Sequence, residues 1–280
     1  MAGSSKLEGR MALITGGSRG IGAAIALAFA AEGADVAFCH NDDDEGAVRV
    51  EAAVRAQGRR AFSWRCDLSD MEAARRLFAD AETALGRVDI LVNNAGVSEE
   101  KAVEAITLEA VDWMMNVHFK ATFVLSQLAY IRMKPRGYGR IINVSSNLAY
   151  KGAPGLAHYS AAKAAVLGFT RSMAQEAAPH GVLVNAIAPG PIDTRLNDTL
   201  SPEWKAWKVG SLPIRRLEGR RRSRPPQCCW PLRMAVSMSD RRCTRTAATS
   251  CPDLAHGKGL WSGSSDRASM ACTPLLPSTV

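Results

Sequence analysis

Two side chains that could share a proton stand four residues apart in this sequence. Tyr159 and Lys163 fall at the start of a predicted helix, so both would lie on one face of it. A lysine ammonium beside a phenol favours the phenolate and lowers the pKa of the phenol. Such a tyrosine can act as a general acid or base near neutral pH. The spacing alone also fits a half-buried tyrosine beside a surface lysine, so it needs support from the rest of the chain.

A glycine-rich segment could hold a phosphate group. Thr15-Gly-Gly-Ser-Arg-Gly-Ile-Gly22 lies between a predicted strand at 11–14 and a helix that ends at Ala31. Gly16, Gly20 and Gly22 would let the backbone turn tightly and approach a pyrophosphate at the helix N-terminus, and Gly22 would allow close packing. The alternative is an ordinary glycine-rich turn, but the strand–loop–helix context favours a dinucleotide site.

The residues after the second predicted strand bear on which dinucleotide would bind. NAD(H) sites usually carry an acidic residue about 20 residues beyond the glycines. Here the strand ends at His40 and Asn41, and the acidic run 42–44 that follows is interpreted as the solvated start of a helix. Arg19 could bind a 2′-phosphate through charged hydrogen bonds. The sequence therefore favours NADP(H) over NAD(H).

Further polar residues follow other predicted strands. Ser145 and Ser146 come after the fifth strand, and Asn93-Asn-Ala-Gly96 after the fourth, at the carboxyl edge where open α/β sheets bind ligands. Either serine could bind a substrate carbonyl or cap a turn. Asn116 falls in the middle of a predicted helix, where asparagine is mildly unfavourable, so it is either exposed or has a specific role.

The elements that would position these residues alternate along the chain. Nearly continuous apolar runs predict strands at 11–14, 35–39, 61–66, 88–92, 140–144 and 182–187. Helical patterns fall between them, up to Ala31 and at 45–57, 71–85, 108–133 and 159–178. This alternation predicts an α/β fold, a Rossmann-type doubly wound parallel sheet in a single domain.

Together these features resemble the short-chain dehydrogenase/reductase family, in its compact subgroup. The resemblance covers residues 7–217 and is closest to 3-oxoacyl-[acyl-carrier-protein] reductase-like members. Ser146 rather than Ser145 has the family's usual separation from Tyr159. The motifs that carry the resemblance are Thr15-Gly-x-x-x-Gly-x-Gly22, Asp67, Asn93-Asn-Ala-Gly96, Asn116, Ser146, Tyr159-x-x-x-Lys163 and Pro189-Gly190.

The resemblance implies hydride transfer between NADP(H) and a carbonyl or secondary alcohol. Tyr159 would exchange the proton, Ser146 would hold the carbonyl oxygen, Lys163 would lower the tyrosine pKa and bind the nicotinamide ribose, and Asn116 would hold a water for proton relay. The implied cofactor-binding residues are Gly16, Ser18, Arg19, Gly20, Ile21, Gly22, Asn41, Asp67, Leu68, Asn94, Ala95, Gly96, Tyr159, Lys163, Pro189, Gly190, Ile192 and Thr194. A dimer or tetramer is expected of the intact family fold.

Composition excludes several other classes. Hydrophobic residues make up 47% of the 280 residues and charged residues 22%, as in globular proteins. The longest apolar stretch is too short to span a bilayer, and the N-terminus has no apolar signal region, so we expect a cytoplasmic protein with no membrane partner. The cysteines lack paired zinc-ligand spacing, and the arginine run 220–222 lacks interleaved aromatics, so no metal and no nucleic acid are expected.

The last 63 residues depart from the family pattern. Residues 218–280 hold ten of the basic and four of the acidic residues and five of the seven cysteines, with no apolar period. Codons for 218–223 that are read one base earlier can give Gly-Gly-Pro-Glu-Glu-Val, which the family would have there, and later segments can give its Asp-Gly-Gly ending. We therefore interpret 1–217 as the NAD(P)-binding domain and 218–280 as an out-of-frame tail, with the last helix and strand lost and the sixth strand left as a bare edge. The alternative function is an inactive nucleotide-binding remnant.

Overall fold

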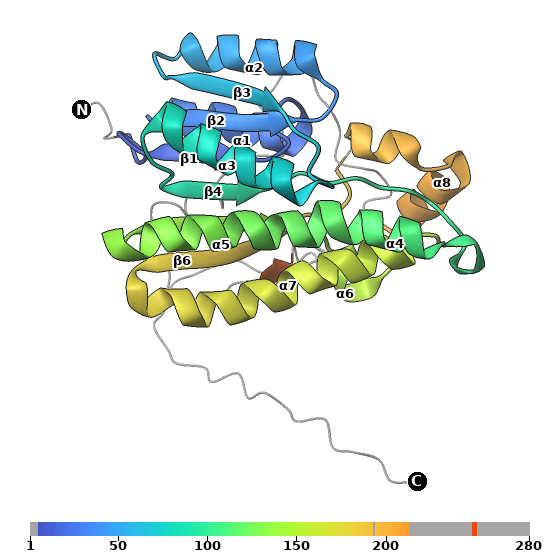
Figure 1. Ribbon diagram of the computed structural model, residues 1–280. Coiled ribbons are helices and arrows are strands. Elements are labelled where there is room, and N and C mark those ends of the chain that lie inside the picture. Colours follow the sequence, from blue (N-terminus) through green and yellow to red (C-terminus); the bar gives the residue numbers. More distant parts are fainter. Residues whose placement is uncertain (1–4, 193, 213–247, 251–280) are drawn as a thin grey trace, which may run out of the picture.

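The fold is a parallel sheet with helices on both faces, as the sequence predicts (Figure 1). The computed structural model describes residues 5–192, 194–212 and 248–250. Seven strands lie in the order β3-β2-β1-β4-β5-β6-β7, and every pairing is parallel. The strands are β1 (Met11–Ile14), β2 (Asp35–His40), β3 (Ala61–Arg65), β4 (Ile90–Asn93), β5 (Gly139–Val144), β6 (Val182–Ala188) and β7 (Ala248–Ser250).

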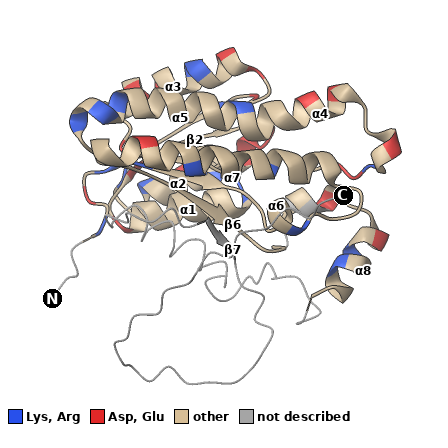
Figure 2. Cartoon of the chain, turned by 90° about the horizontal axis from the view of Figure 1, so that it is seen from below, with Lys and Arg blue, Asp and Glu red and all other residues tan. Residues whose placement is uncertain are grey.

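The helices divide into two layers (Figure 2). Helices α1 and α2 pack on one face of the sheet, and α3, α5 and α7 pack on the other, because alternate residues such as Leu13 and Ile14 point to opposite faces. The described helices are α1 (Gly20–Ala31), α2 (Asp44–Arg55), α3 (Met71–Leu85), α4 (Leu108–Met115), α5 (Ala121–Met133), α6 (Leu148–Lys151), α7 (Ala157–Ala177) and α8 (Pro202–Gly210), with short 3-10 segments at Val103–Ala105, Lys134–Arg136, Ala178–His180 and Arg195–Thr199.

The long helix predicted at 108–133 is present but is not uniform. Between α4 and α5 the chain forms a five-residue π-helical segment, η2 (Asn116–Lys120). Each residue of such a segment bonds one position further along the chain than in an α-helix, so the faces before and after it are out of phase. His118 of η2 meets Tyr159 of α7.

The sequence predicts that β6 has a bare outer edge, and this prediction is wrong at three residues of the strand. Strand β7 pairs in parallel with β6, with Ala186 opposite Ala248 and Ala188 opposite Ser250. A parallel edge offers unpaired N–H and C=O groups that any extended segment can bind through its main chain, whatever its side chains. The other residues of the predicted tail, and residues 213–217 before it, lie outside the described part of the chain.

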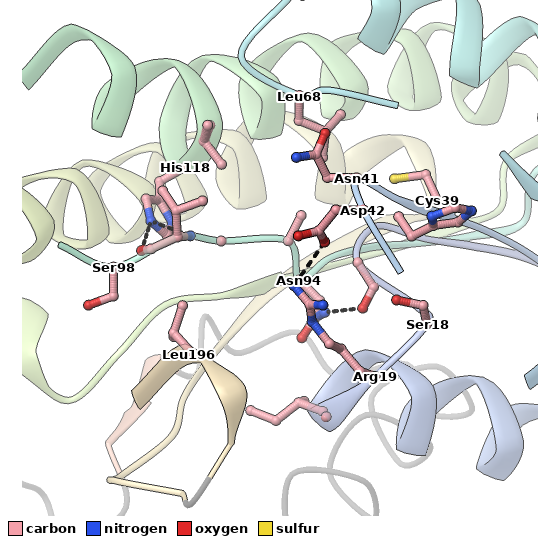
Figure 3. Close-up of a pocket in the computed structure, with 18 of the residues that line it drawn as sticks. Ser18, Arg19, Cys39, Asn41, Asp42, Leu68, Asn94, Ser98, His118 and Leu196 are labelled. Atoms are coloured by element: carbon pink, nitrogen blue, oxygen red, sulfur yellow. Dashed lines mark hydrogen bonds and ion pairs between the residues drawn. The ribbon is translucent and has the colours of Figure 1, made fainter. Parts of the chain in front are cut away.

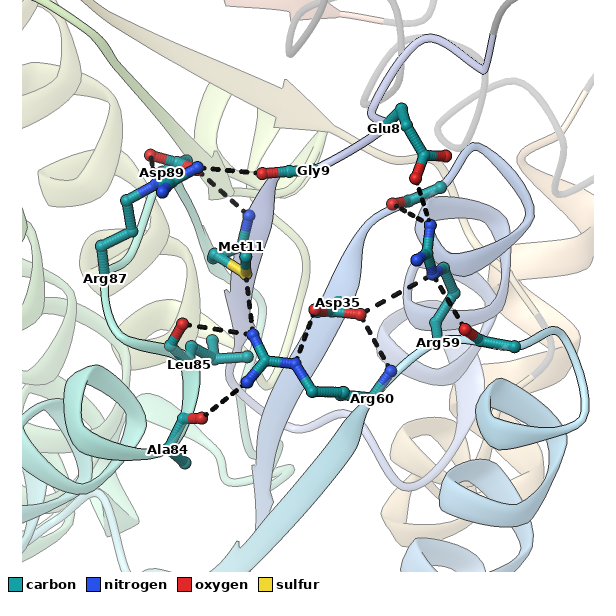
Figure 4. Close-up of polar contacts among 12 residues, drawn as sticks. Glu8, Gly9, Met11, Asp35, Arg59, Arg60, Ala84, Leu85, Arg87 and Asp89 are labelled. Carbon is teal, nitrogen blue, oxygen red and sulfur yellow. Dashed lines mark hydrogen bonds and ion pairs between the residues drawn. The ribbon is translucent and has the colours of Figure 1, made fainter.

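A cluster of ion pairs ties the amino ends of the strands to the helices (Figure 4). Arg60 Nε lies 2.7 Å from the Asp35 carboxylate, and the guanidinium also donates to the carbonyls of Ala84 and Leu85 at the end of α3. Burial raises the pKa of Asp35, but the hydrogen bonds and charges of Arg60 and Arg59 outweigh this and hold the pKa below its usual value.

We expect Asp35→Ala to destabilise the fold by about 1–3 kcal/mol, because it leaves Arg60 without its charged acceptor. Urea unfolding of the variant measures this cost. Glu45→Ala is the matched control, since Glu45 pairs with Arg49 on an exposed face of α2 and such pairs contribute about 0–1 kcal/mol. Equal losses in the two variants would contradict the assignment of a structural role to Asp35.

Candidate active site

The loop between β1 and α1 lies against the end of β4. Gly16 has a φ of 65°, a conformation that favours glycine. Asn94 Nδ2 donates to the carbonyls of Thr15 and Gly16 at 2.9 and 3.1 Å, and the Thr15 hydroxyl accepts from the N–H of Asn94 at 2.9 Å. A Cβ on Gly22 would lie 2.0 Å from the Gly16 carbonyl oxygen, so only glycine allows α1 to approach the loop this closely.

The N-terminus of α1 has no side-chain cap, unlike that of several other helices. Arg19 precedes α1 and makes no capping hydrogen bond, whereas Asp43, Asp70, Thr107 and Ser201 cap α2, α3, α4 and α8. The first N–H groups of a helix have no partners within the helix and attract anions. The loop therefore presents donors to a phosphate group.

A cavity of about 670 Å³ opens at this carboxyl edge of the sheet (Figure 3). It lies where the strand order reverses between β1 and β4, the usual ligand position in doubly wound sheets. Of the residues predicted to bind cofactor, those that line it are Gly16, Ser18, Arg19, Gly20, Ile21, Asn41, Asp67, Leu68, Asn94, Ala95, Gly96, Lys163 and Thr194. Gly22 is not among them and acts through packing instead.

Charged groups at one end of the cavity come from two elements. Arg19 lies 3.1 Å from the Asp42 carboxylate and 3.9 Å from that of Asp43. His40, at the end of β2, is buried and lines the cavity with Cys39 and Cys66. The end of β2 thus carries no acid, as predicted, but Asp42 reaches the cavity and pairs with Arg19, which the sequence interpretation missed.

A smaller cavity of about 110 Å³ adjoins the first one and holds the predicted proton-transfer groups. Ser146 and Tyr159 line it, and Lys163 lines both cavities. The predicted Pro189, Gly190 and Ile192 also line the smaller cavity, together with Leu200 and Trp204 from the segment around α8, which the sequence did not single out. The structure thus brings the candidate acid, its serine and its lysine to one small cavity, and the lysine also borders the larger one.

Burial controls the ionisation of the tyrosine and the lysine. It raises the pKa of Tyr159, while the hydrogen bond with Ser146 acts in the opposite direction. Burial also lowers the pKa of Lys163 to about 7. Lys163 Nζ donates to the Val144 carbonyl at 2.8 Å and lies 5.9 Å from the centre of the Tyr159 ring. In this arrangement the hydrogen bond with Ser146, and not the charge of Lys163, favours the phenolate form of Tyr159.

The low pKa of Lys163 predicts a pH-dependent stability. Its pKa in the fold is below that of a free lysine, so the unfolded chain binds more protons between about pH 7 and 10, and this contribution to stability rises with pH there. We expect the wild type to gain up to about 1.4 kcal/mol per pH unit relative to Lys163→Met. Urea unfolding of both proteins at several pH values tests this; parallel pH curves would contradict it.

The structure separates the two neighbouring serines. The Ser145 hydroxyl donates to the Lys163 carbonyl at 2.8 Å and is occupied by the backbone of α7. The Ser146 hydroxyl accepts from the N–H of Leu148 at 3.1 Å, which leaves its proton available to the cavity that Tyr159 shares. Ser146, which was chosen from its spacing, stays the predicted serine of the site.

Asn116, the residue that the resemblance implies would hold a water, is the first residue of η2. His118, two residues later, lines the larger cavity and packs against Tyr159. Val117 and His118 are the buried residues of η2. No helical pattern in the sequence signals this, although a histidine inside an otherwise apolar stretch was visible.

Buried amides hold β4 and β5 in place behind the site. Asn93 Nδ2 donates to the Ser126 hydroxyl at 2.9 Å and to Asn143 Oδ1 at 2.8 Å, and Asn143 in turn donates to Thr170 at 2.9 Å. This chain links α5, both strands and α7, so the strand ends that carry Asn94 and Ser146 are fixed relative to each other. Among the residues that the structure describes, no cluster resembles a metal site and no helix could cross a membrane.

Comparison with known proteins agrees with this geometry. Residues 10–205 match the family model described as short chain dehydrogenase. Acetoacetyl-CoA reductase of Shinella zoogloeoides is 39% identical, over 72% of this chain and 85% of its own. The 3-oxoacyl-[acyl-carrier-protein] reductase of Aquifex aeolicus is 35% identical, over 75% and 85%.

Solved structures show the same fold. A short chain dehydrogenase from Burkholderia cenocepacia in complex with NADP is 35% identical, with a TM-score of 0.75 over 85% of this chain and 94% of its own. NAD+-bound xylitol dehydrogenase is 26% identical, with a TM-score of 0.73 over 84% and 93%. The chain belongs to the short-chain dehydrogenase/reductase family and is an oxidoreductase.

Proposed function

We propose that this chain uses NADP(H) to interconvert a carbonyl compound and a secondary alcohol. The observation that carries the proposal is the shared wall of the two cavities, where Lys163 borders both and Tyr159 and Ser146 border the smaller one. A cofactor in the large cavity and a small substrate in the other would then meet beside a proton donor. NADPH oxidation with a 3-oxoacyl thioester, by the chain with its reading frame restored near codon 217, tests the proposal; a complete absence of oxidation would count against it.

The large cavity fits a dinucleotide. Its glycine loop has the positive φ angles of Gly16 and Gly20, and α1 leaves its N-terminal donors without a side-chain cap. Arg19 would hold the 2′-phosphate, while Asp67 and Leu68 would border the adenine. Bound there, NADPH supplies the hydride.

The residues of the smaller cavity would handle the substrate oxygen. The Tyr159 hydroxyl would give its proton to that oxygen, and the Ser146 hydroxyl would hold the oxygen in place. Lys163, which is positive below about pH 7, would bind the ribose, and the hydrogen bond from Ser146 would favour the phenolate that remains.

A 3-oxoacyl thioester is the substrate class that we propose. Two of the curated relatives that match most of the described domain are named for the reduction of such compounds. The smaller cavity has the apolar side chains of Leu156, Leu200 and Trp204 in its wall, which suits a short acyl chain beside the reacting carbonyl.

Charge at the cavity predicts the choice of cofactor. Arg19→Ala should weaken NADPH binding relative to NADH by about 1–2 kcal/mol, because a charged hydrogen bond to the 2′-phosphate is lost. Asp42→Asn is the matched opposite change: it removes the carboxylate that now pairs with Arg19 and should strengthen NADPH binding. Fluorescence titration of both cofactors measures the dissociation constants. Equal affinities for NADPH and NADH in the frame-restored protein would overturn the preference.

The out-of-frame tail stays part of the proposal. We propose that residues 218–280 are an out-of-frame tail that stands where the family has its last helix and strand. The predicted catalytic residues all lie within 1–217. The competing function, an inactive nucleotide-binding remnant, would bind NADPH without oxidising it. The oligomer and the cytoplasmic location stay predictions from the sequence.

A further inference from the structure

Two buried cysteines line the cofactor cavity, and the proposed reaction gives neither of them a role. Cys39 is the fifth residue of β2 and Cys66 follows the last residue of β3, so both lie at the carboxyl edge of the sheet. They are 1% and 8% exposed, and both are free thiols. Figure 3 shows the Cys39 sulfur among the residues that line the cavity. The other five cysteines belong to residues 218–280 and lie outside the described part of the chain.

The register of β2 and β3 brings these two thiols to one face of the sheet. Cys39 pairs with Trp64, and Cys66 lies two residues after Trp64, so both cysteine side chains point the same way. The ladder continues past β3, because the N–H of Cys66 donates to the His40 carbonyl at 2.8 Å. The two side chains belong to one hydrophobic cluster and are hydrogen-bonded to each other. The thiols are therefore adjacent across the two strands.

Their surroundings make the two thiols chemically different. The hydrogen bond from Cys39 lowers the pKa of Cys66, although burial and the charge of Asp67 oppose this. The same hydrogen bond and burial raise the pKa of Cys39 well above its usual value, against the effect of the Gly16 N–H. Because the thiolate is the reactive form, Cys66 is the more reactive of the two and Cys39 keeps its proton. A low-pKa cysteine beside a second thiol is the arrangement of redox-sensitive sites.

Both cysteines are joined directly to segments that would hold the dinucleotide. The N–H of Gly17 donates to the Cys39 carbonyl at 2.9 Å, and the N–H of Gly16 donates to the Cys39 sulfur. Cys66 comes directly before Asp67, which would border the adenine. A bond between the two sulfurs would move the acceptor of the Gly16 N–H and pull on the chain before Asp67. It would thus change the cavity on two sides.

We propose that Cys39 and Cys66 form a reversible disulfide when a hydroperoxide enters the cavity, and that this bond weakens the binding of NADPH. The inference rests on the proposed binding of NADPH in the large cavity. It assigns a modification site to two side chains that the reaction itself does not use.

The oxidation proceeds in two steps. The Cys66 thiolate attacks one oxygen of hydrogen peroxide, the O–O bond breaks, and the other oxygen leaves as hydroxide, which takes up the proton that Cys66 gave to solvent. The Cys39 sulfur then attacks the sulfur of the Cys66 sulfenic acid, and the hydroxyl of that acid leaves as water with the Cys39 proton. Two thiols and one peroxide thus give one disulfide and two waters. A dithiol reverses the bond by thiol–disulfide exchange.

Oxidation and cofactor binding would oppose each other. A disulfide that weakens NADPH binding must itself form less readily once NADPH is bound, because the coupling between two sites is reciprocal. NADPH in the cavity would also keep peroxide away from Cys66. Peroxide would therefore act on this chain mainly when NADPH is scarce.

Peptide mapping tests the bond itself. After treatment with hydrogen peroxide, trypsin should release segments 20–49 and 66–75 joined through Cys39 and Cys66, two hydrogens lighter than their sum. Dithiothreitol should separate them. Both the 280-residue chain and the chain with its reading frame restored can be mapped, because the peptides distinguish these two cysteines from any others. If peroxide yields no linked pair in either chain, the proposal is wrong.

Two matched replacements test the order of the steps. In Cys39→Ser the sulfenic acid of Cys66 has no second thiol to react with, so dimedone should trap it. In Cys66→Ser the remaining thiol is the one with the raised pKa, so it should react with peroxide more slowly and take up little dimedone. Equal labelling of the two variants, or the reverse order, would contradict the assignment of Cys66 as the attacking thiolate.

Fluorescence titration measures the consequence for the cofactor. In the frame-restored chain, peroxide should raise the dissociation constant of NADPH by about tenfold or more, and dithiothreitol should restore it. In Cys66→Ser the constant should be the same before and after peroxide. An unchanged constant in the disulfide-bonded protein, or a loss of its circular dichroism signal, would overturn the inference.

The outcomes also separate this inference from the proposed function. If the reduced protein binds NADPH but does not oxidise it with a thioester, the proposed function fails, and the titration still decides whether the disulfide weakens binding. If the reduced protein binds no NADPH, the proposed function and the effect on the cofactor both fail, and peptide mapping still decides whether the bond forms.

Discussion

In the chain with its reading frame restored near codon 217, Tyr159→Phe is expected to abolish nearly all turnover while it leaves the affinity for NADPH unchanged. The replacement keeps the buried ring that packs against His118 and removes only the hydroxyl that contacts Ser146. General acid–base groups typically contribute about 10²–10⁴-fold in rate, so kcat should fall by at least that order. Steady-state NADPH oxidation gives kcat, and fluorescence titration gives the dissociation constant. A variant that retains substantial reductase activity would refute the assignment.

The serines provide the internal control for this experiment. Ser146→Ala should reduce kcat strongly because its hydroxyl faces the cavity, whereas Ser145→Ala should mainly reduce stability, because its hydroxyl binds the Lys163 carbonyl. Lys163→Ala should lower both kcat and NADPH affinity, since the lysine has two roles in the proposal. If Ser145→Ala lowered kcat more than Ser146→Ala, the serine assignment would be wrong.

Restoring one base near codon 217 is expected to convert this chain into a more stable and more active oligomer. In the described residues, β6 has only the three residues of β7 on its outer edge, although every residue of β6 is buried. The family's last helix and strand would cover that edge along more of its length and bury apolar surface, at about 25 cal/mol for each Å². We expect the 280-residue chain to express poorly, to aggregate or to be inactive.

Circular dichroism melting, size-exclusion chromatography and NADPH oxidation of both chains test this expectation. A matched control carries the restored frame together with Tyr159→Phe, and it should be as stable as the restored chain but inactive. This separates an effect on folding from an effect on chemistry. If the 280-residue chain is itself an active, well-folded oligomer whose tail resists proteolysis, the frameshift interpretation is wrong and the tail is a structural element.

Local patterns in the sequence determined most of the fold and much of the candidate site. The strands were recognisable because residues buried on both faces of a parallel sheet form unbroken apolar runs, such as β5 and β6. Tyr159 and Lys163 share the inner face of α7, where both are buried, because their spacing matches one helical turn. The glycine loop was predictable because Gly16 and Gly22 meet steric limits that only glycine satisfies.

Contacts between distant segments decided the rest. His118 of the π-helical segment η2 packs against Tyr159, and an α-helical period carried along the sequence cannot show the phase of that segment. The pKa of Lys163 near 7 comes from desolvation, which depends on how completely the fold encloses the amine. Strand β7 joins the sheet through main-chain hydrogen bonds, which any residue other than proline can make, so side-chain patterns in the tail could not reveal it.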